Sequence, residues 1–178
     1  MSATTTTVLT YPTSYTPTTR LQPSLTFLEL YTAKVDSLDL SGPSTAYYSP
    51  NAIFYNTDGT VYSGGTAIWT WMRGLFGPFA ALKHNILSIR LTQGVEVEGL
   101  GKGDLAVLET QTSFWLKGPD GARQEEPVVV PRLLSFLVGE AEDGLGTQGR
   151  WIVEGKVWWD TGVLMREVAR RKGESETR

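Results

Sequence analysis

An aspartate, a tyrosine and the single histidine give this sequence its clearest potential for chemistry. Asp36 lies near the end of an expected helix, Tyr55 ends a short apolar segment, and His84 lies at the start of a later one. A carboxylate, a phenol and an imidazole are groups that move protons in enclosed sites. If the three converge, we expect Asp36 and His84 to exchange protons with a ligand, and Tyr55 to donate a hydrogen bond to a developing oxyanion.

Two of these residues have structural interpretations that the sequence leaves open. Asp36 would also be typical of a solvated helix end, beside Asp39. Tyr55 would also fit a core position with a satisfied hydroxyl group. Burial distinguishes the two interpretations of Asp36, because an apolar pocket would raise the pKa of its carboxyl group and make it a usable base near neutral pH.

The direction of the His84 ring depends on an irregularity in its strand. Leu82 and Ile86 share a face with His84 and favour an inward ring, because side chains alternate along a strand. Further along, the apolar face is the other one, with Leu87 and Ile89. A β-bulge near Ile86 and Leu87 would reconcile the two halves. Without it, His84 would lie on the outer face.

The first half of the chain predicts helices and one hairpin. Pro23 and Ser24 open a helix with a single apolar stripe, Ser24 being the expected N-cap, and Thr66 is the expected cap of a later helix. Asp58 and Gly59 are typical of a tight hairpin turn. The expected elements are helices over 23–40, 44–48 and 66–76, and strands over 52–55 and 61–62.

The second half predicts a meander of strands. Turns rather than helices separate the apolar runs, which indicates an antiparallel sheet and an α+β fold. Pro131 requires an edge position or a bulge in its strand. The expected strands cover 82–92, 104–116, 128–138 and 151–160, and 164–172 is a terminal helix or a strand end.

Composition predicts one soluble domain and excludes several kinds of site. The net charge of −3 gives no basic surface for nucleic acid, and the absence of cysteine excludes disulfides and thiolate chemistry. One histidine excludes a multi-histidine metal site, so we expect no metal and no cofactor. The first residues lack a secretory signal and no apolar run is long enough to span a bilayer, which favours a cytoplasmic protein without a membrane partner. We expect a flexible Thr/Pro-rich arm over 1–22, one domain over 23–172 and a flexible tail over 173–178.

Several aromatic, apolar and charged residues could contact a ligand. The aromatic content could fill a core or line a pocket for a flat organic molecule. Glu109 and Arg132 are charged residues in apolar strands, and either pair with each other across the sheet or hold a polar ligand. The candidate substrate contacts are Tyr31, Tyr48, Trp69, Met72, Phe76, Glu109, Arg132 and Trp158.

The order of these elements resembles the cone fold of the nuclear transport factor 2-like superfamily, in its SnoaL-like and scytalone dehydratase-like branch. The matching stretches are Leu28–Leu40, Ala46–Ala52, Gly64–Gly65, Ile68–Met72 and Trp151–Asp160. The resemblance implies N-terminal helices packed in a curved antiparallel sheet around a deep cavity. It also implies catalytic roles for Asp36, Tyr55 and His84, although the chain has no second histidine and carries Val35 where scytalone dehydratase has a tyrosine.

The resemblance implies three functional hypotheses. The first is a cofactor-free isomerase, cyclase or dehydratase of secondary metabolism that acts on a hydrophobic polyketide- or terpenoid-like substrate. The second is a non-catalytic module of the same fold that binds a small molecule. The third is a structural dimerisation domain with a filled cavity. In such families the convex sheet face often pairs, so we also expect a homodimer.

Overall fold

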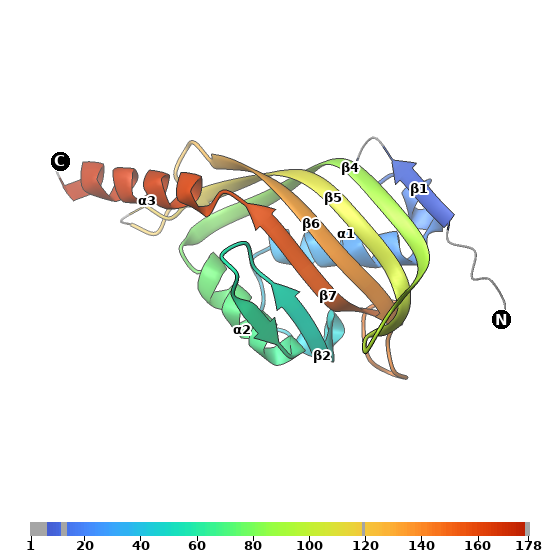
Figure 1. Cartoon of the computed structure of the whole chain (residues 1–178). Helices are drawn as coiled ribbons and strands as arrows, with labels where there is room; N and C mark the ends of the chain where they lie inside the picture. The colour runs from blue at the N-terminus through green and yellow to red at the C-terminus, as the bar shows by residue number, and fades with distance from the viewer. Residues whose placement is uncertain (1–6, 12–13, 119, 177–178) are drawn as a thin grey trace, which may run out of the picture.

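The sheet of this protein curves around its first helix. The structure, a computed structural model, describes residues 7–11, 14–118 and 120–176. Helix α1 (Pro23–Asp36) lies along the concave side of the sheet, and α2 (Gly65–Phe76) packs against one end of it (Figure 1). The strands are β1 (Thr7–Tyr11), β2 (Tyr48–Tyr55), β3 (Val61–Ser63), β4 (Phe79–Val97), β5 (Gly101–Leu116), β6 (Val128–Glu140) and β7 (Arg150–Trp159).

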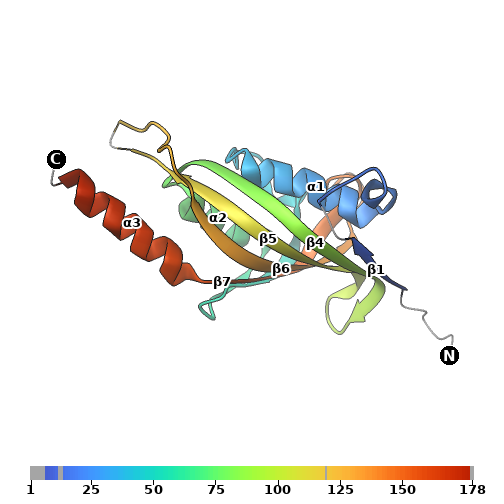
Figure 2. The ribbon, with the colours of Figure 1, turned by 90° about the horizontal axis from the view of Figure 1, so that it is seen from above.

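The strand order is β1-β4-β5-β6-β7-β2-β3, which confirms an α+β fold with a long meander. The sheet is mixed rather than wholly antiparallel, because β2 runs parallel to β7. Two 3₁₀ turns, η1 (Thr19–Leu21) and η2 (Ser44–Ala46), flank α1. The last helix, α3 (Thr161–Glu176), points away from the cone (Figure 2). No helix in the described part of the chain is long and apolar enough to cross a membrane.

The N-terminal arm differs from the flexible segment expected over 1–22. Thr7–Tyr11 form an edge strand that pairs antiparallel with β4, from Thr7 opposite Gln93 to Tyr11 opposite Ile89. The described part of the arm therefore extends the sheet. Residues 1–6 and 12–13 lie outside the described residues. At the other end, α3 continues to Glu176, into the predicted tail, and 177–178 lie outside the described residues.

The N-caps of α1 and α2 each lie two residues before the caps expected. Gln22 is the N-cap of α1, and Ser24 instead donates a hydrogen bond from its buried hydroxyl to Asp104 Oδ2 (2.7 Å). The N-cap of α2 is Gly64, with φ of 91°, a conformation that residues other than glycine rarely adopt. At Gly65 a Cβ atom would lie 2.8 Å from the Ser49 carbonyl oxygen, so glycine allows α2 to pack closely on β2.

The convex face of the sheet carries exposed apolar side chains at β6 and β7. Val129, Leu133 and Trp158 are between 36% and 47% exposed. Homodimerisation through this face stays a prediction.

Pro131 occupies a local edge of the sheet, as expected. It directly precedes Arg132, where the pairing of β6 with β7 ends.

Candidate active site

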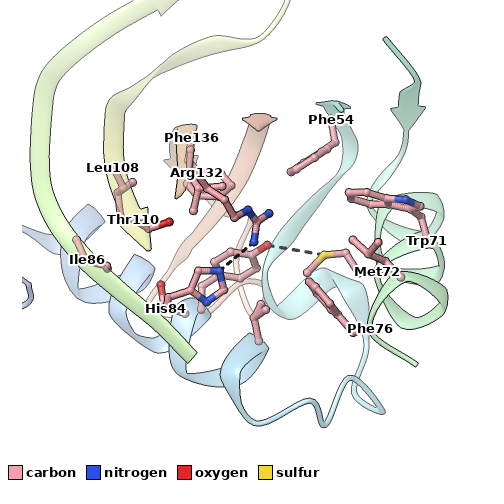
Figure 3. A pocket seen from close by; sticks show the side chains of 15 residues that line it. Phe54, Trp71, Met72, Phe76, His84, Ile86, Leu108, Thr110, Arg132 and Phe136 are labelled. Atoms are coloured by element: carbon pink, nitrogen blue, oxygen red, sulfur yellow. Dashed lines mark hydrogen bonds between the residues drawn. The ribbon is translucent and has the colours of Figure 1, made fainter. Parts of the chain in front are cut away.

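A cavity lies between the concave face of the sheet and the helices α1 and α2 (Figure 3). It has about 540 Å³ of space free of protein atoms, counted with the solvent at its mouth, and it is narrow. Its walls are formed by Tyr31, Thr32, Val35, Phe54, Trp71, Met72, Leu75, Phe76, His84, Ile86, Leu108, Thr110, Arg132, Leu134 and Phe136.

Asp36 and His84 meet at one end of this cavity, as the sequence predicts. Asp36 is the last residue of α1, and its Oδ1 atom lies 2.6 Å from Nδ1 of His84. The backbone N–H of His84 donates to both carboxylate oxygens, at 3.1 and 3.2 Å. The carboxylate therefore holds both the ring and the backbone of His84. Lys83 Nζ is 3.7 Å from Asp36 Oδ2 on the solvent side.

The contacts of the imidazole define its tautomer. Arg132 Nη1 lies 3.3 Å from His84 Nε2 and points at it (Figure 3). Because a guanidinium group only donates, Nε2 is the acceptor, and the ring proton is on Nδ1, facing Asp36. Burial lowers the pKa of His84 from its ordinary value, Asp36 opposes this, and the charge of Arg132 adds to it. His84 is therefore a neutral imidazole near pH 7, with its basic nitrogen toward the cavity.

A bulge in β4 after His84 lets the residues on both sides of it face inward, which confirms the irregularity predicted there. Ile86 pairs with Thr110 of β5, but Ser88 pairs with Glu109, so Leu87 is the extra residue. Leu87 is 44% exposed, whereas Ile86 is buried. The bulge lets the apolar residues on both sides of it face the interior.

Arg132 contributes a buried positive charge to the cavity. It is 9% exposed, and its guanidinium carbon lies 4.9 Å from the centre of the Trp159 ring. Burial lowers the pKa of Arg132 to about 10, which leaves the group protonated at neutral pH. No ion pair among the described residues includes it.

The cross-strand pair expected between Glu109 and Arg132 is wrong. Arg132 is opposite Thr110, and Glu109 is opposite Leu133, so the two charges lie on opposite faces of the sheet. Glu109 is on the convex side, where it accepts a hydrogen bond from Ser88 Oγ (2.7 Å). It is therefore outside the cavity.

Tyr31 and Tyr48 form a neutral polar pair on the helix side. Their hydroxyl oxygens are 2.5 Å apart, and each also lies close to Met72 Sδ, at 3.7 and 3.6 Å. Burial raises the pKa of Tyr31 to about 12 and that of Tyr48 well above its ordinary value, so both are phenols at neutral pH. Tyr31 lines the cavity, and Tyr48 supports it from the core.

The two tryptophans of α2 have different surroundings. Trp69, an expected ligand contact, is buried in the core, where its Nε1 donates to the carbonyl oxygens of Leu40 and Gly42, both at 3.0 Å. Trp71 lines the cavity instead and stacks on Tyr62, with ring centroids 4.5 Å apart. Met72 and Phe76 line the cavity as expected.

Tyr55 and Trp158 lie outside the cavity, which corrects the placement expected for them. In β2 the inward residue is Phe54, which is 4% exposed, so alternation turns Tyr55 outward to 36% exposure. The Tyr55 ring lies 5.2 Å from Lys156 Nζ on that outer surface. Trp158 is likewise 47% exposed. The candidate tyrosine that lines the cavity together with His84 is therefore Tyr31, on α1.

Sequence reasoning missed several walls of the cavity. Alternation along the strand that ends at Tyr55 places Phe54 and Tyr55 on opposite faces. It does not say which of the two faces is the inner one, and that information is needed to predict Phe54 as a wall. Thr110 and Phe136 depend on strand register, which nothing in the local pattern specifies. Trp71 depends on how α2 rolls against the sheet. No group of three or more histidine, cysteine, aspartate or glutamate side chains gathers as a metal site in the part of the chain that the structure describes.

The fold relates the chain to known proteins, although its sequence does not. No protein-family model matches the sequence, and no curated protein matches it. A Shewanella putrefaciens protein described as a SnoaL-like polyketide cyclase is similar at 17% identity and a TM-score of 0.54, over 88% of this chain and 99% of the other. ActVI-ORFA of Streptomyces coelicolor is similar at 12% identity and a TM-score of 0.60, over 79% and 97%.

A third similar structure is an LEH-like epoxide hydrolase of M. tuberculosis, at 16% identity and a TM-score of 0.53, over 83% of this chain and 90% of the other. Identities this low establish the fold and no more. The chain therefore has the nuclear transport factor 2-like cone fold, in the form found in SnoaL-like proteins.

Proposed function

We propose that this protein is a cofactor-independent acid–base catalyst that isomerises, cyclises or dehydrates a hydrophobic polyketide- or terpenoid-like substrate. The observation that carries the proposal is the chain of contacts from Asp36 through His84 to the cavity. Asp36 fixes the tautomer, and Nε2 of a neutral His84 faces the enclosed space. A buried neutral imidazole in that position is a suitable general base near pH 7.

The residues of the cavity divide the work of such a reaction. His84 Nε2 takes a proton from a carbon or oxygen atom of the substrate, and Asp36 stabilises the imidazolium ion that forms. The same nitrogen then returns the proton at another atom of the substrate. Arg132 stabilises negative charge that develops on a substrate oxygen, which is the role that the sequence assigns to Tyr55. The apolar walls hold the substrate in a reactive conformation.

One observation favours a second candidate function, the binding of a small molecule without turnover. His84 Nε2 accepts a hydrogen bond from Arg132, so its lone pair is occupied in this structure. A cavity that keeps its only imidazole engaged would hold a ligand without reacting with it.

The test begins with small-molecule extracts of the source organism with and without the gene. A compound that accumulates in the deletion strain is then incubated with the purified protein and no added cofactor. We expect wild-type protein to convert it and His84→Gln to fail. A compound that binds and is recovered unchanged supports the binding function, and conversion by both proteins at equal rates contradicts the role of His84.

A further inference from the structure

Arg132 leaves one edge of its guanidinium group without any partner. Its Nε atom is buried and makes no hydrogen bond, and Nη2 makes none among the described residues. Only Nη1 does, to His84. Elsewhere in the chain this same edge binds carboxylates. Arg20 donates from Nε and Nη2 to the two oxygens of Glu29, at 2.7 and 2.6 Å. The difference is that Arg20 lies at the surface and Arg132 in a cavity.

In the part of the chain that the structure describes, no carboxylate forms an ion pair with Arg132. The Trp159 ring lies against the guanidinium group, and its own Nε1 is a second buried donor without an acceptor. Asp36 contacts the far side of the imidazole, at Nδ1 rather than Nε2. Arg132 Nε and Trp159 Nε1 are therefore two buried donors without an acceptor, and Arg132, which carries the first of them, is an unpaired cation that lines the cavity. Buried groups of this kind are normally paired, so these donors lack an acceptor here.

We propose that the cavity takes a flat apolar carboxylate, and that its carboxylate group pairs with Nε and Nη2 of Arg132. A carboxylate matches this edge in both charge and geometry, because its two oxygens accept two parallel N–H groups in one plane. The walls around that group include the aromatic side chains of Phe54, Trp71 and Phe136, which suit the faces of flat rings. Nε is out of reach of solvent here, so the entering ligand displaces side-chain atoms that cover it.

The proposal rests on the proposed function and deepens it, because the ion pair between the ligand and Arg132 also changes the basicity of His84. Three charged groups act on His84: Asp36 raises its pKa, whereas Arg132 and Lys83 lower it. A carboxylate on Arg132 neutralises the charge next to Nε2 and draws Nη1 away from it. The lone pair of His84 then becomes free and more basic when the substrate is bound.

The experiment compares two probes of equal shape, 2-naphthoate and 2-naphthamide, by calorimetric titration at pH 7.5. We expect wild-type protein to bind the carboxylate at least about tenfold more tightly than the amide, a difference of about 1.4 kcal/mol. Arg132→Gln should lose this preference and retain affinity for the amide. Arg20→Gln, which removes the same edge at the surface, should keep the preference.

A second readout needs no variant. Saturation with 2-naphthoate should raise the pKa of the His84 imidazole in a proton NMR titration, and saturation with 2-naphthamide should leave it unchanged. Equal affinities for the two probes, no binding of either up to its solubility limit, or a preference that persists in Arg132→Gln would overturn the proposal.

These outcomes are independent of turnover. Selective binding of the carboxylate by a protein that converts nothing would leave this proposal standing and remove the catalytic one. Turnover of a neutral compound by a protein that shows no preference for the carboxylate would support the catalytic proposal and remove this one.

Discussion

The two ends of the cavity are built on different physical principles. The polar corner, formed by Asp36, His84 and Arg132, depends on charge and on hydrogen bonds between three separate elements. The apolar wall, formed by Trp71, Met72 and Phe76, comes from one helix and depends on shape. Removing one partner from a buried polar cluster leaves the others unsatisfied, whereas a trimmed apolar wall loses only contact area. The corner should therefore govern the chemistry, and the wall the affinity.

The largest effect is expected from the polar corner itself. His84→Gln and Asp36→Asn should each lower kcat by about 10²- to 10⁴-fold on the compound that accumulates in the deletion strain. Because the two residues act as one unit, the double variant should lose no more than the worse single variant. Steady-state kinetics of the four proteins measure this. Losses that multiply in the double variant would show that the two residues act independently.

The tryptophans of α2 provide a matched pair that separates stability from binding. Trp69→Phe should lower the free energy of unfolding by about 1 kcal/mol, because it removes the buried indole donor and leaves the carbonyl groups of Leu40 and Gly42 with Arg73 as their side-chain donor. Trp71→Phe should fold normally and weaken 2-naphthoate binding by about fivefold through lost contact in the cavity. Urea unfolding and calorimetry on both variants measure the two effects. The opposite assignment would mean that Trp69 is the ligand contact.

The stability of the protein should depend on the protonation of His84. Its folded pKa lies below the ordinary value of 6.5, so the unfolded chain binds the proton more tightly. Stability should therefore fall as the pH drops below about 6.5 toward the folded pKa, and this contribution is constant above that window. His84→Gln should lack this part of the pH dependence in unfolding curves between pH 8 and pH 5. Parallel curves for the two proteins would show that His84 is not perturbed.

The smallest effect is expected at Tyr55. Its hydroxyl lies on the outer face, so Tyr55→Phe should leave kcat and KM within about twofold of wild type, as is usual for surface changes. The sequence alone predicts the reverse, a lost oxyanion donor. Tyr31→Phe is the informative companion variant, because Tyr31 lines the cavity. A large loss of kcat in Tyr55→Phe would show that β2 reorganises when substrate binds.

The contrast between the two ends also explains what could be read from the sequence. Asp36 and His84 were identifiable because an acid at a helix end and a lone histidine at a strand start are rare, chemically distinctive signals. Even the bulge at Leu87 was visible, as a change in the phase of apolar alternation. The order of helices and strands followed from local turn and period signals in the same way.

The remaining parts of the site depend on distances that local patterns do not encode. Strand register decides that Arg132 is opposite Thr110, and not beside Glu109. The roll of α2 decides that Trp71 rather than Trp69 lines the cavity. The parallel pairing of β2 with β7 fixes which face of β2 is inside, and so removes Tyr55 from the site. In a strand, a shift of the register by one residue moves each side chain to the opposite face of the sheet.

The most direct test of the account is the pKa of the single imidazole in three proteins, measured by proton NMR titration. Wild-type His84 should titrate below 6.5, Asp36→Asn should titrate lower still because the supporting carboxylate is gone, and Arg132→Gln should titrate higher because the opposing charge is gone. That order would establish the polar corner as one coupled unit facing the cavity. A value near 6.5 in all three proteins would contradict the account, because it would place the ring in solvent, away from both partners.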